Sequence, residues 1–166
     1  ANLEGANLEG VDLGRANLKG ANLKGANLEG ANLEGAILNQ ADLGKVSLGG
    51  ANLAGADFTG ANLAGADFSN AKLNQADFSQ DDLNGTDFSG ACIEGGGIRR
   101  CQIKNSLFDK ASLIAVSFSG TTLSEAHLRG ASLVRLSLTD ENLAGVDLSG
   151  CELTDSDFSD ANLEGA

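Results

Sequence analysis

Few residues of this chain are placed to do chemistry. The sequence has 166 residues and one histidine, His127, which is the only imidazole that could act as a general base. Serines are common, but they recur at even spacing, as at Ser69, Ser79 and Ser89, which is typical of turns. A nucleophile needs a base and an orienting group beside it. No such set is recognisable, so we predict a protein that is not an enzyme and that uses no cofactor.

The cysteines and the acidic residues do not indicate a metal site. The sequence has three cysteines, Cys92, Cys101 and Cys151. Their spacing is not that of metal ligands, and their odd number does not suggest a disulfide framework. Free thiols favour a reducing compartment such as the cytoplasm. The chain has no methionine, so we expect a processed chain or a fragment, and a mature periplasmic or thylakoid-lumen form stays open. Asp and Asn are numerous but evenly spread, and we predict no coordination cage.

All these residues belong to a repeat of five. Every fifth residue from Leu3 to Leu163 is Leu, Phe or Ile, which makes 33 central positions without an exception. The residue two before the centre, the inner position, is usually Ala. The residue directly before the centre is usually Asn, Asp or Ser, and the two residues after it, the corner positions, are mostly small or polar. The repeat predicts a single domain over residues 1–166.

A period of five fits neither a helix nor a flat strand. Along an α-helix, five residues turn the side chain by roughly 500°, so successive apolar residues would spiral around the axis. Along a strand, side chains alternate between faces, so an odd period would place them on opposite faces. One apolar face therefore needs a corner in every unit. Such units wind into a coil around an apolar interior, and coil stacks on coil.

The seven phenylalanines indicate how many units form a coil. If residues 20 apart stack, Phe68, Phe88 and Phe108 form one column, and Phe58 and Phe78 form another on the opposite side. Three units per coil would scatter the rings over every column. We therefore predict an all-β, quadrilateral parallel β-helix, a solenoid with four pentapeptides per coil and about eight coils.

The repeat unit also resembles a known signature. Ala1–Gly5 (ANLEG) and Ala66–Asn70 (ADFSN) are similar to the A(D/N)LXX motif of the pentapeptide-repeat family, and the resemblance covers the whole chain. It implies that the quadrilateral β-helix is right-handed, which the spacing alone does not tell. The family is abundant in cyanobacteria, and most of its members have no known biochemical activity. The resemblance therefore favours a rod-like scaffold or protein-interaction module.

Some inner positions depart from alanine. Cys101 and Cys151 fit there as small buried side chains, whereas Cys92 lies directly before a centre and is expected to be more exposed. Asp81 and Glu141 place carboxylates in inner positions on the same side, three coils apart. Either they turn outward at a local distortion, or they find partners inside. The Asn or Asp before each centre, a position that His127 also occupies, is expected to cap the corner or to face outward.

The charge pattern restricts the partners. A net charge of −12 disfavours direct nucleic-acid binding, and no apolar run is long enough for a membrane span. Family members that resemble B-form DNA in shape and charge bind type II topoisomerases, so a DNA-mimicking modulator of gyrase is the alternative function. A mimic needs continuous negative potential. Here the acidic stretches 57–94 and 140–164 flank a basic belt, which argues against DNA mimicry. The basic belt consists of Arg99, Arg100, Lys104 and Lys110.

The stretch Gly95–Cys101, GGGIRRC, begins this belt. The central positions Ile93 and Ile98 stay in frame, so we expect the coil to run through it without a domain boundary. Gly96 is expected to leave an inner position empty. The stretch is either a worn repeat or a docking point for an acidic protein partner, or for the acidic stretch of a neighbouring rod. The protein partner itself is unknown.

The repeats run to both ends of the sequence, from Ala1 to Ala166. A solenoid normally needs caps that cover its terminal coils. Uncapped coils expose strand edges and apolar side chains. Either caps are missing from this chain, or it is a module of a longer protein, or rods self-associate end to end.

Overall fold

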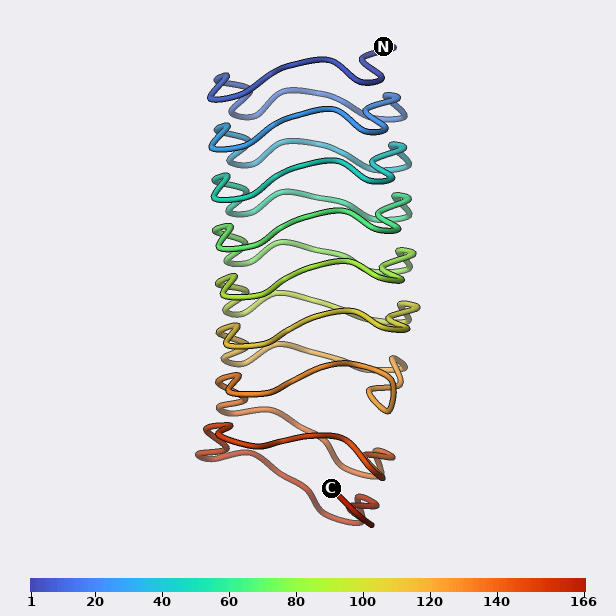
Figure 1. The fold of residues 1–166 in the computed structure, drawn as a ribbon, viewed down its shortest axis with the longest axis vertical. Helices are drawn as coiled ribbons and strands as arrows, with labels where there is room; N and C mark the ends of the chain where they lie inside the picture. Colours follow the sequence, from blue (N-terminus) through green and yellow to red (C-terminus); the bar gives the residue numbers. More distant parts are fainter.

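The computed structural model describes all 166 residues as a rod of stacked coils, with the termini at opposite ends (Figure 1). The chain forms no helix and no extended strand, so it has no helix that could cross a membrane. Its pairing consists of isolated parallel bridges, each joining two residues 20 positions apart, from Asn2–Asn22 to Asn142–Asn162. Four five-residue units therefore lie between stacked neighbours, as the phenylalanine spacing predicted.

Each corner has the same backbone geometry. The second corner residue has a left-handed backbone in every unit but one, for example φ 64° at Gly25 and φ 58° at Asn70, and the exception is Glu125. The Asn or Asp before the centre supports the turn: Asp67 Oδ1 accepts a hydrogen bond of 2.8 Å from the Ser69 N–H. The predicted capping role of this position is confirmed in every unit that carries Asn or Asp there.

Three sets of backbone hydrogen bonds join successive coils. The N–H of a central residue donates to a carbonyl in the next coil, as from Leu23 to Asp42 at 2.7 Å. The second corner residue also donates to the next coil, as from Gly25 to Gly44 at 2.9 Å. The residue before the centre donates to the previous coil, as from Asn22 to Ala1 at 2.9 Å. We call these three sets the ladder. They satisfy the backbone groups that the narrow interior would otherwise leave without partners.

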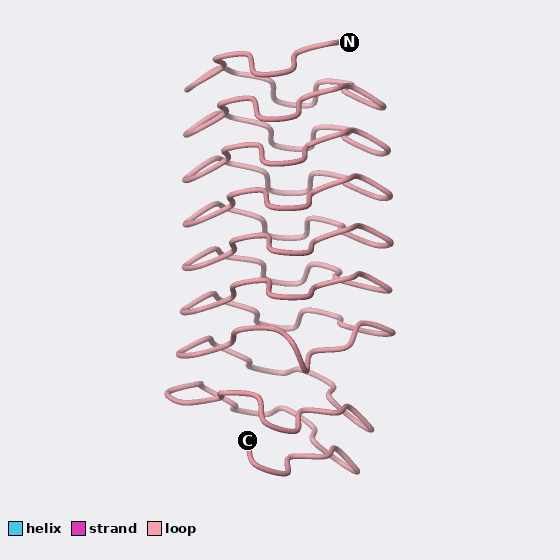
Figure 2. Ribbon diagram, turned by 45° about the vertical axis from the view of Figure 1, so that its right-hand side comes forward, coloured by secondary structure: helices cyan, strands magenta, loops and turns pink.

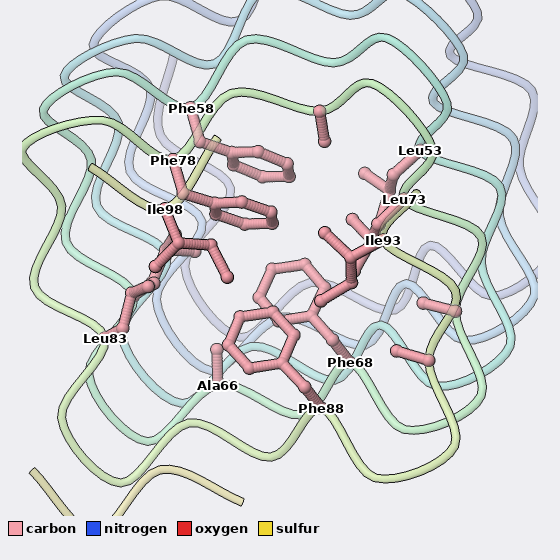
Figure 3. Packing of buried hydrophobic residues seen from close by; sticks show 14 of the residues in the cluster. Leu53, Phe58, Ala66, Phe68, Leu73, Phe78, Leu83, Phe88, Ile93 and Ile98 are labelled. Carbon is pink, nitrogen blue, oxygen red and sulfur yellow. The ribbon is translucent and has the colours of Figure 1, made fainter. Parts of the chain in front are cut away.

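The interior is filled by the central and inner side chains. Central residues from Leu23 to Leu143 are buried, and most inner residues between them are buried too. The phenylalanines form the two predicted columns (Figure 3): Phe58 stacks on Phe78 with ring centroids 4.8 Å apart, and Phe68 stacks on Phe88 at 5.2 Å. The columns meet edge to face, with 5.6 Å between the rings of Phe58 and Phe68.

The ladder is interrupted near the C-terminal end, where the even spacing of the coils is lost (Figure 2). Bridges are present at every step up to Gly97–Ser117. Beyond it, four bridges that the repeat predicts are absent. They would join residue 102 to 122, residue 117 to 137, residue 122 to 142, and residue 127 to 147. On the remaining side the bridges Ser112–Ser132 and Ser132–Glu152 persist. We call the opening between residues 116–129 and 135–147 the seam.

Large stacked inner residues account for two of the four missing bridges, those between residues 117 and 137 and between residues 122 and 142. Val116 lies one coil before Leu136, and Thr121 lies one coil before Glu141, so bulky side chains are stacked where the regular coils hold alanine. Overfilling a close-packed interior costs free energy, and the backbone shifts to relieve it. The side that stays closed has Ala111 and Ala131 at these positions.

Candidate interaction surface

The two arginines of the basic belt share one exposed corner. Arg99 and Arg100 occupy the two corner positions after Ile98 and are exposed to solvent. A Cβ atom at Gly97 would lie 2.6 Å from the Arg99 Nη1 atom. The guanidinium group therefore covers the place where most units carry an Asn or Asp side chain, and glycine at position 97 leaves room for it.

The glycines before these arginines do not break the coil. The Gly97 N–H donates to the Ala76 carbonyl at 3.1 Å, and the Gly97 carbonyl accepts from Phe78 at 2.8 Å. The prediction that the coil runs through this stretch is confirmed. The expectation of an empty inner position at Gly96 is wrong, because a Cβ there would lie 2.9 Å from the Ala76 carbonyl oxygen and 3.1 Å from Ile93 Cγ2.

The two lysines of the belt lie elsewhere on the same coil. Lys104 is at the next corner and forms the only ion pair of the molecule, 3.5 Å from its Nζ to Glu125 Oε2. Lys110 lies ten residues after Arg100, which is half a coil away. The four residues therefore form a belt around the rod, and only the arginine pair forms a compact basic site. Arginine is suited to such a site, since its planar fork binds carboxylates in bidentate fashion.

Acidic side chains lie along the rod next to the arginine corner. Asp57 and Asp77 occupy the same position as Gly97 in the two preceding coils, as the bridges Asp57–Asp77 and Asp77–Gly97 show. In the following coil this position is Ser117. The arginine corner is thus the point where an acidic row of the regular coils ends.

The seam opens clefts on the surface. One cleft of about 550 Å³ is lined by polar residues of mixed charge, among them Asp109, Glu125, His127, Arg129 and Asp147. His127 is exposed, in agreement with its predicted outward position. No three His, Cys, Asp or Glu side chains come close enough to hold a metal ion.

Inner hydroxyl groups bond to the preceding coil. Thr86 Oγ1 donates to the Leu63 carbonyl at 2.9 Å, and Ser106 Oγ donates to the Leu83 carbonyl at 2.7 Å. In both cases the acceptor lies 23 residues before the donor. Buried hydroxyl groups in this fold therefore follow a fixed register, which satisfies their hydrogen bonding without water.

The thiols follow the same register but are not poised for chemistry. Cys101 Sγ donates to the Phe78 carbonyl at 2.8 Å, and burial raises the pKa of this thiol to about 11. Burial also raises the pKa of the half-buried Cys92. Cys151 bonds in the same way to Leu128 but is only partly buried, contrary to expectation, because few residues follow it to cover its coil. A thiol with a raised pKa is a poor nucleophile near neutral pH.

The two inner carboxylates behave differently. Asp81 is buried, and its Oδ1 atom accepts a hydrogen bond of 2.9 Å from the Ala61 N–H, so it finds a partner inside. Burial raises the pKa of Asp81 to about 8. Glu141 lies at the seam and is partly exposed, and burial raises its pKa as well. Asp81 thus fits the alternative of a partner inside the rod, and Glu141 fits the alternative of an outward turn at a local distortion.

The seam is the feature that the sequence analysis missed. A signal was present, because Val116, Thr121, Leu136 and Glu141 are the inner residues of neighbouring units in two successive coils. One such residue alone is no signal, because a single large inner residue, such as Val46, leaves the ladder intact.

Comparison with known proteins places the repeat among characterised folds. The family model for pentapeptide repeats matches in eight copies, over residues 1–40, 41–80, 61–95, 101–140, 111–149 and 131–166. The chain is similar to the crystal structure of HetL, a pentapeptide repeat protein from the cyanobacterium Nostoc sp. strain PCC 7120 involved in regulating heterocyst differentiation. The TM-score is 0.56 and the identity 28%, over 98% of this chain and 74% of HetL.

A second solved structure, alr5209 from Nostoc PCC 7120, also a pentapeptide repeat protein, is 30% identical with a TM-score of 0.50, over 58% of this chain and 85% of the other. The fluoroquinolone resistance protein QnrB1, in a trypsin-treated form, is 20% identical with a TM-score of 0.45, over 92% of this chain and 82% of QnrB1. No curated protein sequence is significantly similar.

Proposed function

Since the chain belongs to the pentapeptide-repeat family, we propose that it is a non-enzymatic, rod-like scaffold or protein-interaction module. The observation that carries this proposal is the regular outer surface, on which corner side chains repeat at fixed intervals around a filled interior. Such a solenoid presents an extended surface for partners. Neither the histidine nor the cysteines lie in a catalytic arrangement.

The proposal includes the finer architecture. The rod is a right-handed quadrilateral β-helix of about eight coils, and residues 1–166 form one domain. The match to repeats along nearly the whole chain and the likeness to HetL support this architecture.

The docking point is the corner of Arg99 and Arg100, and its partner is a protein segment rich in carboxylates. Both side chains are exposed, and neither forms an ion pair within the rod. Lys104 and Lys110 extend the basic belt to other corners and assist a partner that wraps around the coil. The acidic stretch of a neighbouring rod would satisfy the same chemistry.

A pull-down with matched variants tests this function. The 166-residue chain, the double variant Arg99→Ala with Arg100→Ala, and the control Arg15→Ala with Arg135→Ala are used as bait under the same conditions. We expect a protein that the wild type and the control retain and the first variant loses. Retention of every partner by the first variant rules out the arginine corner, and a reproducible enzymatic turnover without any protein partner rules out the scaffold.

A second candidate is a DNA-mimicking modulator of a type II topoisomerase such as gyrase. The net charge of −12 on a narrow rod favours it. The exposed arginine corner in the middle of the rod disfavours it, because it interrupts the negative potential. A supercoiling assay decides: no effect on gyrase at micromolar protein removes this candidate.

We also propose that the isolated 166-residue chain self-associates end to end. Leu153 and Leu163 are exposed, and with Leu148 and Phe158 they line an apolar cleft of about 450 Å³ in the last coil. Sedimentation velocity at rising concentration tests this. Self-association that is lost in Leu163→Asp supports stacking, and a monomer at all concentrations contradicts it.

A further inference from the structure

Two of the inner hydroxyl groups each make two hydrogen bonds to the preceding coil. Thr121 Oγ1 accepts from the Cys101 N–H at 3.0 Å and donates to the Ile98 carbonyl at 2.7 Å. Ser156 Oγ likewise accepts from the Leu136 N–H and donates to the Leu133 carbonyl. In both cases the N–H donor lies 20 residues before the hydroxyl group, and the carbonyl acceptor lies 23 residues before it. In these two places the hydroxyl group bridges an N–H and a carbonyl that bond directly to each other in regular units, as Ala26 does to Leu23.

Asp81 makes only the first of these two bonds. Its Oδ1 atom accepts from the Ala61 N–H, 20 residues earlier, at 2.9 Å. Its Oδ2 atom is buried and has no hydrogen-bond partner. In the same register the acceptor 23 residues earlier is the Phe58 carbonyl. A carboxylate has no proton to give to that oxygen, whereas a neutral carboxylic acid has one.

We propose that Asp81 is a neutral carboxylic acid in the folded rod, that its Oδ2–H donates to the Phe58 carbonyl oxygen, and that its ionisation loosens the stack between these two coils. Asp81 is then a pH-sensitive element of the fold. The proposal completes the pattern of Thr121 and Ser156 and gives the buried Oδ2 atom its missing partner.

The surroundings of Asp81 favour the neutral form. Burial disfavours the charged carboxylate and raises its pKa from the ordinary 3.8 to about 8, although the backbone N–H groups of Ala61 and Gly60 oppose this rise. The nearby charged groups are Asp57 and Asp77, whose negative charges raise the pKa further. The titratable group of the next coil is the Cys101 thiol. No basic side chain pairs with Asp81, because the only ion pair joins Lys104 and Glu125.

The raised pKa of Asp81 determines how the stability of the rod changes with pH. In the unfolded chain the carboxyl group titrates near its ordinary pKa, so between about pH 4 and about pH 8 the folded state binds one more proton than the unfolded state. The stabilising contribution is complete below this window and is lost as the pH rises through it. The loosened coil lies directly before the coil of Arg99 and Arg100, so high pH would weaken the support of that corner.

The test compares Asp81→Asn with the wild type. The asparagine amide donates to Phe58 and accepts from Ala61 but does not titrate, and Asp155→Asn, at an exposed corner, is the charge-matched control. Urea unfolding is measured from pH 4.5 to pH 9. We expect the unfolding equilibrium constant of the wild type to rise relative to Asp81→Asn by up to about tenfold per pH unit within the window. The control should follow the wild type, and equal pH dependence of all three proteins would overturn the proposal.

A titration that needs no variant protects the test against misfolding of Asp81→Asn. The carboxyl ¹³C resonance of Asp81 is followed by NMR in the folded wild type. A transition well above pH 6 supports the neutral acid. A transition near pH 4 overturns it, because the carboxylate would then be ionised in the folded state at neutral pH.

Discussion

The coils up to Arg100 and the segment from Cys101 to Asp147 follow the same five-residue repeat, but only the first part has an unbroken ladder. The central positions do not explain the difference, because they are Leu, Phe or Ile in both parts. The inner positions do. Up to residue 100 most are alanine, whereas the second part stacks Val116 under Leu136 and Thr121 under Glu141.

The comparison separates two roles within one repeat. The central residue sets where the chain turns inward and therefore the register. The volume of the inner residue sets whether two coils can approach to hydrogen-bonding distance. Val46 shows the tolerance, because this single enlargement leaves both of its coils bridged. Close-packed interiors absorb one enlarged side chain more easily than two that are stacked.

The largest expected effect is that of truncating a ring in the regular part. Phe88 is fully buried and stacks between Phe68 and Phe108, with centroid distances of 5.2 and 4.9 Å. Phe88→Ala should lower the free energy of unfolding by about 3–5 kcal/mol in urea unfolding. Phe118, at the seam, has only an edge contact of 6.3 Å to Phe108, so Phe118→Ala should cost clearly less. Equal losses would show that the seam is packed as tightly as the regular coils.

A stacked pair of enlarged inner residues should transfer the defect to the regular part. Ala56 and Ala76 are buried and lie on the same side as Val116 and Leu136, three coils earlier. Ala56→Val with Ala76→Leu copies that pair and should lower the free energy of unfolding by about 1–3 kcal/mol through overpacking. The matched control is Ala76→Val alone, which copies the tolerated Val46 and should cost less. If the double variant leaves stability and the local ladder unchanged, inner volume does not cause the seam.

Glu141→Ala should have the smallest effect on stability, and a favourable one. Burial raises the pKa of this carboxyl group, so the folded state binds protons more tightly than the unfolded state. The charged form therefore destabilises the rod above the ordinary pKa of the group and has no effect well below it. We expect Glu141→Ala to gain less than about 1 kcal/mol near pH 8, since solvent screens the charge. Glu164→Ala, at an exposed position, is the control, and an equal gain there would contradict the account.

Much of the fold could be predicted from the sequence because the repeat is a local rule. The fivefold spacing of Leu, Phe and Ile defines one inward residue per unit, and the positions of Phe58, Phe68, Phe78 and Phe88 indicate a 20-residue coil. The caps at the corners follow from Asn and Asp at a fixed place. These features depend on residues that are close in sequence or that repeat without error.

The remaining features depend on contacts between coils. The seam arises from pairs of inner residues 20 positions apart, which no single unit reveals. The space taken by the Arg99 guanidinium over Gly97 depends on a side-chain conformation that the sequence does not specify. The partner of Asp81 is a backbone N–H of the preceding coil, so its burial is clear only when the coils are stacked.

Native-state hydrogen exchange along the chain tests the central claim, that one repeat builds a continuous ladder and that stacked large inner residues open it. The N–H groups of Leu113 and Leu133 donate to the next coil at 2.8 Å and should be protected, as should those of the regular coils. The amides of Phe118, Leu123 and Leu128 make no ladder bond and should exchange through small local openings. Protection of Phe118 and Leu128 equal to that of Leu113, or a loss of protection centred on Gly95–Cys101 instead, would contradict the account.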